Sequence, residues 1–125
     1  MARDARRTLG ALGEAAASAW LTAHGYEVLD RNVRTRSGEI DLVARCHDLV
    51  VFVEVKSRSG TGFGHPGEAV AAVKQRRLAR LASAYLTARG WHGCLTRFDV
   101  ITVLTGASGR VLRIEHVPDA FRVAI

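Results

Sequence analysis

The sequence predicts an α/β fold in which a mixed central sheet is flanked by helices, with the element order αβββαβ and one extra C-terminal strand. Two observations lead to this fold class. The apolar spacing changes from helical to strand-like after residue 24 and back again near residue 68. The second helical segment is also long enough to cross over between two parallel strands. A chain of 125 residues fits a single domain over residues 1–125.

Two segments have the apolar spacing of amphipathic helices. In residues 6–24, leucines, alanines and Trp20 recur at intervals of three and four, and Gly25 follows as a stop signal. Residues 68–89 return to the same spacing and also end before a glycine. Trp20 and Tyr85 fall on the apolar faces of these helices, so we expect both to pack in the core and not to stack on bases.

Five segments have the composition of strands and are separated by turn residues. Their ranges are 26–33, 39–46, 49–57, 97–104 and 110–117. The glycine-rich residues 60–67, which include His65, are expected to form a loop beside the substrate. They contain the spacing G-x-x-x-x-G, but Glu68-Ala69 stands where a phosphate-binding loop needs Lys followed by Ser or Thr, which excludes that mode of nucleotide binding.

The charge balance favours a polyanionic partner. The net charge is +6 with an isoelectric point near 10.3, and an excess of positive charge on a small domain is typical of proteins that bind nucleic acid. No apolar run approaches the ~20 residues of a membrane span, so we expect a cytoplasmic protein with no membrane partner. Cys46 and Cys94 stand singly, without a disulfide framework, and together with His47 and His92 they lack the usual spacing of zinc ligands.

Two charges interrupt a strand that is otherwise apolar. Residues 49–55 read LVVFVEV, which is typical of a strand covered on both faces. Glu54 lies inside this run, and Lys56 comes directly after it. Taken alone, this pair is most simply an exposed ion pair worth about 0–1 kcal/mol. Inside a covered strand, however, such charges need a partner, a metal or an open cleft.

The preceding strand supplies further carboxylates. If residues 47–48 form a two-residue turn, the numbers of paired residues sum to 95, so that Asp41 lies opposite Glu54 and Glu39 opposite Lys56. All four side chains then share one face of the hairpin. Two opposed carboxylates destabilise a sheet unless positive charge lies between them, and a divalent cation meets that need.

Oxygen ligands of this kind suit Mg²⁺ or Mn²⁺. In this interpretation Asp41 and Glu54 hold the metal, and the peptide carbonyl of Val55 completes the protein ligands. Lys56 would then position or deprotonate an attacking water, a task for which Lys is better suited than Arg because its pKa shifts readily. All but two of the 18 basic residues are arginines, and Lys56 is one of the two exceptions.

Residues 38–44, GEIDLVA, and 51–58, VFVEVKSR, closely resemble the YraN-like family of small bacterial proteins. Shorter matches extend the resemblance over nearly the whole chain, at residues 13–14, 31–32, 74, 77–78 and 97–100. This family is similar to archaeal Holliday junction resolvases and belongs to the restriction-endonuclease-like PD-(D/E)xK superfamily. The resemblance implies a restriction-endonuclease-like fold, a Mg²⁺-dependent endonuclease activity on DNA, with branched or damaged DNA as candidate substrates, and a homodimer.

The resemblance also assigns roles to single residues. It implies that Asp41, Glu54 and Lys56 occupy the metal-binding and catalytic positions of the superfamily. Glu14 matches an acidic residue that the first helix often contributes, and Gln75 matches a supporting polar position in the second helix. We place Glu39 with Gln75 as a supporting residue because it shares the face of the other carboxylates.

Basic side chains gather near the first three strands and on the second helix. Six are expected to contact DNA phosphates: Arg31, Arg34, Arg36, Arg58, Lys74 and Arg77. Arg76 and Arg80 belong to the same helical cluster, for which a solvated face is the simpler alternative. Such contacts position the backbone without reading sequence, and they make binding sensitive to salt. Asp99, which interrupts an apolar strand, either supports the site or forms a salt bridge with Arg97 or Arg58.

Two other functions remain open. The chain could retain the nuclease fold as a non-catalytic nucleic-acid-binding or scaffold protein, although such a protein has no need to keep Asp41, Glu54 and Lys56 together. Its substrate could also be RNA. Metal titration distinguishes the first alternative, and competition between matched DNA and RNA distinguishes the second.

Overall fold

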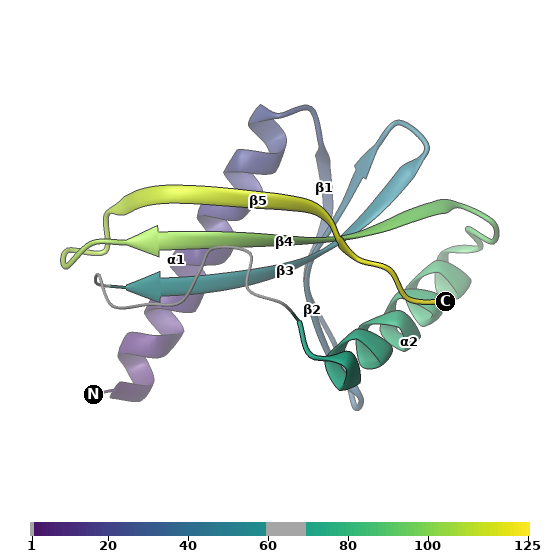
Figure 1. Ribbon diagram of the computed structural model, residues 1–125, viewed down its shortest axis with the longest axis horizontal. Coiled ribbons are helices and arrows are strands. Elements are labelled where there is room, and N and C mark those ends of the chain that lie inside the picture. Colours follow the sequence, from purple (N-terminus) through teal and green to yellow (C-terminus); the bar gives the residue numbers. More distant parts are fainter. Residues whose placement is uncertain (1, 60–69) are drawn as a thin grey trace.

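The computed structural model describes residues 2–59 and 70–125. The elements are α1 (Ala2–Ala23), β1 (Glu27–Thr35), β2 (Gly38–Cys46), β3 (Leu49–Ser59), α2 (Ala72–Arg89), β4 (Leu95–Thr105) and β5 (Val111–Phe121). The strands form one sheet in the order β1-β2-β3-β4-β5, and every neighbouring pair is antiparallel except β3 and β4. The predicted mixed sheet, with a restriction-endonuclease-like αβββαβ core and one extra strand, is confirmed (Figure 1).

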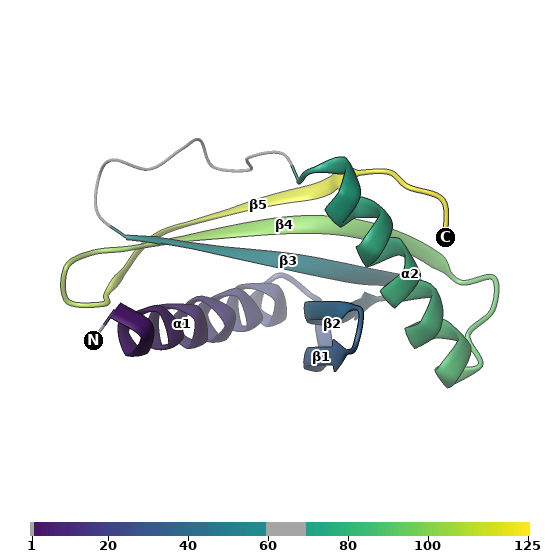
Figure 2. The same cartoon turned by 90° about the horizontal axis from the view of Figure 1, so that it is seen from below.

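The two helices cover opposite faces of the sheet (Figure 2). α1 packs through residues such as Leu21 onto the face that carries Val53, and Trp20 lies at the margin of this cluster. α2 packs through residues such as Leu78 and Tyr85 onto the other face. Both aromatic side chains therefore contribute to packing, as their helical spacing predicts.

The hairpin of β2 and β3 has the predicted register over most of its length. Residues 47–48 form a two-residue turn, and the pairs run from Cys46–Leu49 to Leu42–Val53, each with a sum of 95. The ladder stops there. The predicted pairs of Asp41 with Glu54 and of Glu39 with Lys56 are not part of it, so this part of the prediction is wrong.

A break in the alternation of β2 explains why the ladder ends. Ile40 belongs to the apolar cluster under α2, whereas Leu42, only two residues later, belongs to the cluster under α1. On the neighbouring strand Asn32 has a φ of 52°, a left-handed conformation that marks a local distortion. β1 and β2 consequently run at a steep angle to the other three strands (Figure 1), and Asp41 lies where β2 leaves β3.

Some element boundaries differ from the predicted ones. α1 begins at Ala2, because the residues before position 6 contain neither Gly nor Pro to stop it. β5 continues to Phe121 through Pro118, which lies at a ladder irregularity on an edge strand where a missing N–H costs no regular pairing. α2 begins at Ala72, after the extended Ala71. The predicted loop at residues 60–67, with His65, and the first two residues of the predicted helix 68–89 lie outside the described residues.

Within the described segments, neither helix has the length and apolar character needed to cross a membrane.

Candidate functional site

A close approach between α1 and β3 sets the first side of the candidate site. Gly13 is buried against Ser57, and a Cβ atom at position 13 would lie 1.9 Å from the Ser57 Oγ atom. Only glycine therefore allows the helix to lie this close to the strand. The next residue along α1 is Glu14, so this contact brings its carboxylate to the sheet.

Three carboxylates meet at this point. Oxygen atoms of Glu14 on α1 and of Glu39 and Asp41 on β2 all lie within 4.8 Å of one another, and all three residues are half-buried. Glu14 and Asp41 were predicted for the catalytic set and Glu39 as a supporting residue. The described part of the chain contains no other such grouping of His, Cys, Asp and Glu.

The surroundings of Asp41 raise the pKa of its carboxyl group. Its Oδ2 atom accepts a hydrogen bond of 2.8 Å from the backbone N–H of Val55, in place of a ladder bond between β2 and β3. Burial raises the pKa of Asp41 from 3.8 to about 7, the negative charges of Glu54, Glu14 and Glu39 add to this rise, and the Val55 hydrogen bond opposes it. Near neutral pH this carboxyl is therefore poised between its two protonation states.

Glu54 approaches the same point from β3. The residue is only 9% exposed, and its Oε1 atom forms an ion pair with the Nζ atom of Lys74 from the first turn of α2. From the sequence, Lys74 was predicted to contact DNA, and its ion pair with Glu54 was not predicted. Its only signal in the sequence is that Lys74 is one of two lysines in an arginine-rich chain.

Lys56 lies two residues beyond Glu54 on a strand whose pairing with β4 is regular from Leu49 to Ser59. Strand alternation therefore places Lys56 on the same side of the sheet as Glu54, as predicted, and the side chain is half-buried. Val55 lies between them and contributes its N–H to Asp41. β3 thus presents an acid, a peptide unit and a lysine in succession at the edge of the carboxylate cluster.

The donor set fits a hard divalent cation. Glu14, Glu39, Asp41 and Glu54 offer only oxygen atoms, and oxygen ligands are the ones that Mg²⁺ and Mn²⁺ prefer. The repulsion that helps to raise the pKa of Asp41 is also the repulsion that a bound cation would relieve. In the structure, the ammonium group of Lys74 neutralises Glu54.

The two predicted supporting residues make local contacts. Glu39 forms an ion pair with Arg34 at 3.5 Å, across the β1–β2 ladder. The Gln75 side-chain amide donates a 2.8 Å hydrogen bond to the backbone oxygen of Val70, at the start of α2. Gln75 thus stabilises the helix start that carries Lys74.

The predicted DNA-contacting residues make different contacts within the protein. Arg31 donates a 2.9 Å hydrogen bond to Ser18 of α1, and Arg58 donates one of 3.1 Å to the backbone oxygen of Ser57. Arg36 is exposed at the β1–β2 turn. Arg77 is also exposed, and its aliphatic stem covers Gly38 at the same turn.

Asp99 is the centre of a buried polar network on the α1 side of the sheet. Arg97 binds both carboxylate oxygens at 2.8 and 2.7 Å, which confirms the predicted salt bridge with this partner. His116 lies 2.7 Å from Oδ2, and the backbone N–H of Asp119 donates to Oδ1 at 2.9 Å. Burial opposes ionisation, but these hydrogen bonds outweigh it and hold the pKa of Asp99 below its usual value.

The outer members of this network, Tyr26 and Trp20, were not predicted from the sequence. Tyr26 accepts a 2.7 Å hydrogen bond from Arg97, and Trp20 donates one of 3.3 Å to the Nδ1 atom of His116. Because an indole N–H can only donate, His116 Nδ1 accepts and its Nε2–H donates to Asp99. The network joins α1, β4 and β5, and we assign it to stability.

Comparison with known proteins gives a consistent family match. The model of the uncharacterised protein family UPF0102 matches residues 13–103. A UPF0102 protein of Symbiobacterium thermophilum is 55% identical over 92% of this chain and 97% of its own length. A UPF0102 protein of Rhodococcus jostii is 50% identical over 90% and 95%, and one of Geobacter metallireducens is 42% identical over 94% and 95%.

Proposed function

The chain belongs to the UPF0102 family, and from that premise and the geometry of the site we propose that it is a metal-dependent endonuclease that hydrolyses phosphodiester bonds in DNA. The observation that carries this proposal is the cluster of Glu14, Glu39 and Asp41 from two elements, with Glu54 of β3 close enough for its charge to raise the pKa of Asp41. Lys56 follows two residues later on the same side of β3. A solvated surface gives no reason for buried or half-buried carboxylates to gather in this way.

The proposed metal is Mg²⁺ or Mn²⁺. When bound, it would supply positive charge that stabilises the phosphate and favours ionisation of an attacking water. Asp41 and Glu54 would hold it, the carbonyl of Val55 would add a neutral oxygen, and Glu14 would contribute from α1. Asp41 must be ionised to serve as a ligand, and its raised pKa makes that step dependent on pH and on the cation.

Lys56 and Lys74 have different parts in this proposal. Lys56 would orient the attacking water as an ammonium donor, or accept the proton of that water when its side chain is a neutral amine. Lys74 would exchange its partner, leaving Glu54 when the metal enters and binding a substrate phosphate. The ion pair between Lys74 and Glu54 supports this order of events, since the two groups already neutralise one another.

Cleavage assays test the proposal. Labelled four-way-junction, flap, single-stranded and duplex DNA would be incubated at low salt with Mg²⁺ or Mn²⁺, using wild type, Glu54→Gln and the control Glu27→Gln. Glu27 is exposed at the start of β1 and carries the same side chain. Cutting by wild type and by the control, with binding but no cutting by Glu54→Gln, is the expected result and would identify the preferred substrate.

Other outcomes would overturn the proposal. DNA binding by wild type without cutting of any substrate would favour the non-catalytic binding or scaffold function. Preference for a matched RNA in competition would change the substrate class. Cutting by Glu54→Gln at the wild-type rate would remove Glu54 from the site.

We also propose that the active form is a homodimer. A four-way junction presents two equivalent strands to be cut, and a symmetric dimer presents two equivalent sites. Sedimentation of the protein with and without junction DNA tests this. A monomer that cuts both strands of one junction in a single binding event would contradict it.

A further inference from the structure

We propose that the outer surface of α2 is a second DNA contact, in which Arg76 and Arg80 bind backbone phosphates beside a groove. We call this feature the α2 groove; it is lined by Arg76, Ala79, Arg80, Ser83, Ala84 and residues 123–125. The inference rests on the proposed function, because it assumes the same DNA substrate. It adds a surface along which that substrate leaves the candidate site.

The charge of α2 is the first observation. The helix has five basic residues and no acidic one. Two of the five are neutralised, Lys74 by Glu54 and Arg89 by Asp30. The remaining three, Arg76, Arg77 and Arg80, have no ion-pair partner among the described residues and are exposed. Uncompensated charge of this density on one short helix requires either water or a polyanion beside it.

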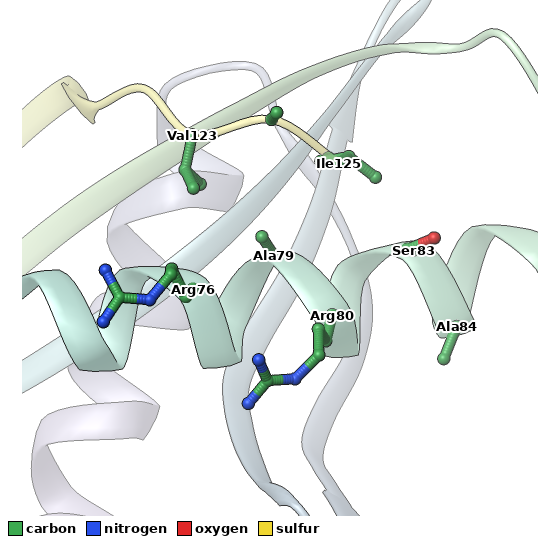
Figure 3. A pocket seen from close by; sticks show the side chains of 8 residues that line it. Arg76, Ala79, Arg80, Ser83, Ala84, Val123 and Ile125 are labelled. Carbon is green, nitrogen blue, oxygen red and sulfur yellow. The ribbon is translucent and has the colours of Figure 1, made fainter.

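The shape of the surface is the second observation. The groove encloses about 510 Å³ between α2 and the C-terminal segment. Figure 3 shows that Arg76 and Arg80 extend in the same direction from successive turns, with Val123 and Ile125 on the other wall. The two arginines are separated by about 6 Å of helical rise, which is comparable to one or two phosphate steps of 3.4 Å along a DNA strand.

Small side chains allow a close approach. Ala79, Ser83 and Ala84 also line the groove. A phosphate backbone can therefore reach both guanidinium groups without displacing bulky residues. Arg is also the side chain that binds phosphate oxygens in a bidentate manner.

The groove and the candidate site lie on different sides of α2. Lys74, half a turn before Arg76, pairs with Glu54, and the stem of Arg77 covers Gly38, the residue before Glu39 of the carboxylate cluster. Lys74 and Arg76 are about 200° apart around the helix, so the groove lies on the side of α2 away from Glu54. Arg77 lies between the two sides, so DNA that extends from the site around α2 would meet Arg77 first and then Arg80 and Arg76.

Nucleic acid fits this surface better than a lipid bilayer does. The large apolar residues of α2, among them Leu78, Leu81 and Tyr85, are buried against the sheet, with Val73 the exposed exception. The helix therefore offers charge but no free apolar face of the kind that inserts into a membrane.

Salt-dependent binding tests the inference. The double variant Arg76→Gln/Arg80→Gln would be compared with Arg110→Gln/Arg113→Gln, which removes the same charge at the β4–β5 end of the molecule, away from α2 (Figure 1). Fluorescence anisotropy with a labelled DNA duplex, in EDTA and from 50 to 200 mM salt, gives the slope of log K against log salt. Loss of two phosphate contacts should make the slope of the Arg76→Gln/Arg80→Gln variant shallower than that of wild type by about 1.8. Between 50 and 200 mM salt, the fold loss of affinity of this variant should therefore be about ten times smaller than that of wild type.

Each outcome has a distinct meaning. A reduced slope in the groove variant alone, with circular dichroism and melting temperature unchanged, supports the contact. Equal slopes in the two double variants would overturn it. Tighter binding of a matched RNA duplex through the same arginines would overturn the assignment to DNA. Salt-dependent DNA binding through the groove by a wild-type protein that cuts nothing would refute the proposed nuclease and leave this inference standing.

Discussion

Replacing Asp41 by Asn should stabilise the metal-free protein, and the gain should grow as the pH rises. In the wild type, burial and the charges of Glu54, Glu14 and Glu39 oppose ionisation of Asp41 in the folded state. Asn has nearly the same shape, carries no charge, and keeps an oxygen that can accept the hydrogen bond from Val55. The substitution therefore removes repulsion without removing the local contact.

The magnitude follows from the change in pKa. The folded-state pKa of Asp41 is about 7 and its ordinary value is 3.8, so between these values the unfolded chain is ionised while the folded protein keeps its proton. The preference of the folded protein for protonated Asp41 adds to the free energy of unfolding of the wild type. This addition is complete below pH 3.8, declines between pH 3.8 and pH 7, and is lost above pH 7. Each pKa unit corresponds to about 1.4 kcal/mol, so the decline between pH 5 and pH 8 is about 3 kcal/mol.

Urea unfolding measures this difference through tryptophan fluorescence, in EDTA at pH 5, 6, 7 and 8. The free energy of unfolding of Asp41→Asn minus that of wild type should increase by about 3 kcal/mol over the series. Asp48→Asn, the same chemical change in the exposed β2–β3 turn, is the matched control. If Asp41→Asn and wild type keep a constant difference from pH 5 to pH 8, the argument about repulsion at Asp41 is refuted.

Three further changes test other contacts. Gly13→Ala should lower the free energy of unfolding in urea by about 1–3 kcal/mol. Ser57→Ala should recover part of this loss in the double variant, because a Cβ atom at position 13 would meet the Ser57 Oγ atom. If the effects of the two substitutions are additive, the close approach is contradicted. Lys74→Met should tighten Mn²⁺ binding measured by calorimetry without DNA, since it frees Glu54, whereas weaker binding would show that the ion pair does not compete with the metal. Asp99→Asn should cost about 3–5 kcal/mol in urea unfolding, because buried donors lose their charged acceptor, and a loss below about 1 kcal/mol would show that the network is dispensable.

The sequence predicts the hairpin well because the information is local. A two-residue turn sets which residues of β2 and β3 face each other, and an apolar strand interrupted by Glu54 marks the charged position. The position at which the β2–β3 ladder ends is not set by local sequence. It depends on the switch of β2 between two apolar clusters and on the left-handed conformation of Asn32 in β1. No residue pattern in the sequence indicates either feature.

The contacts of Lys74 and of the Asp99 network are harder to predict for a related reason. Lys74 reaches Glu54 only because α2 packs on one particular part of the sheet, 20 residues away along the chain. His116 reaches Asp99 only because β5 pairs with β4 in one register. A charged residue in an apolar strand indicates that a partner exists, but the identity of the partner is a property of tertiary packing.

The carboxylate cluster also links the stability of the protein to its proposed chemistry. Glu14 comes from α1, Glu39 and Asp41 come from β2, and the neighbouring Glu54 comes from β3. Their repulsion therefore acts between elements whose apolar clusters hold them together. Buried packing around Leu21 and Val53 offsets that repulsion in the folded protein. A cation that binds the cluster would relieve the repulsion and stabilise the fold by an amount set by its concentration and affinity. Metal affinity and resistance to unfolding should therefore rise together, and a substitution that loosens α1, such as Gly13→Ala, should weaken both.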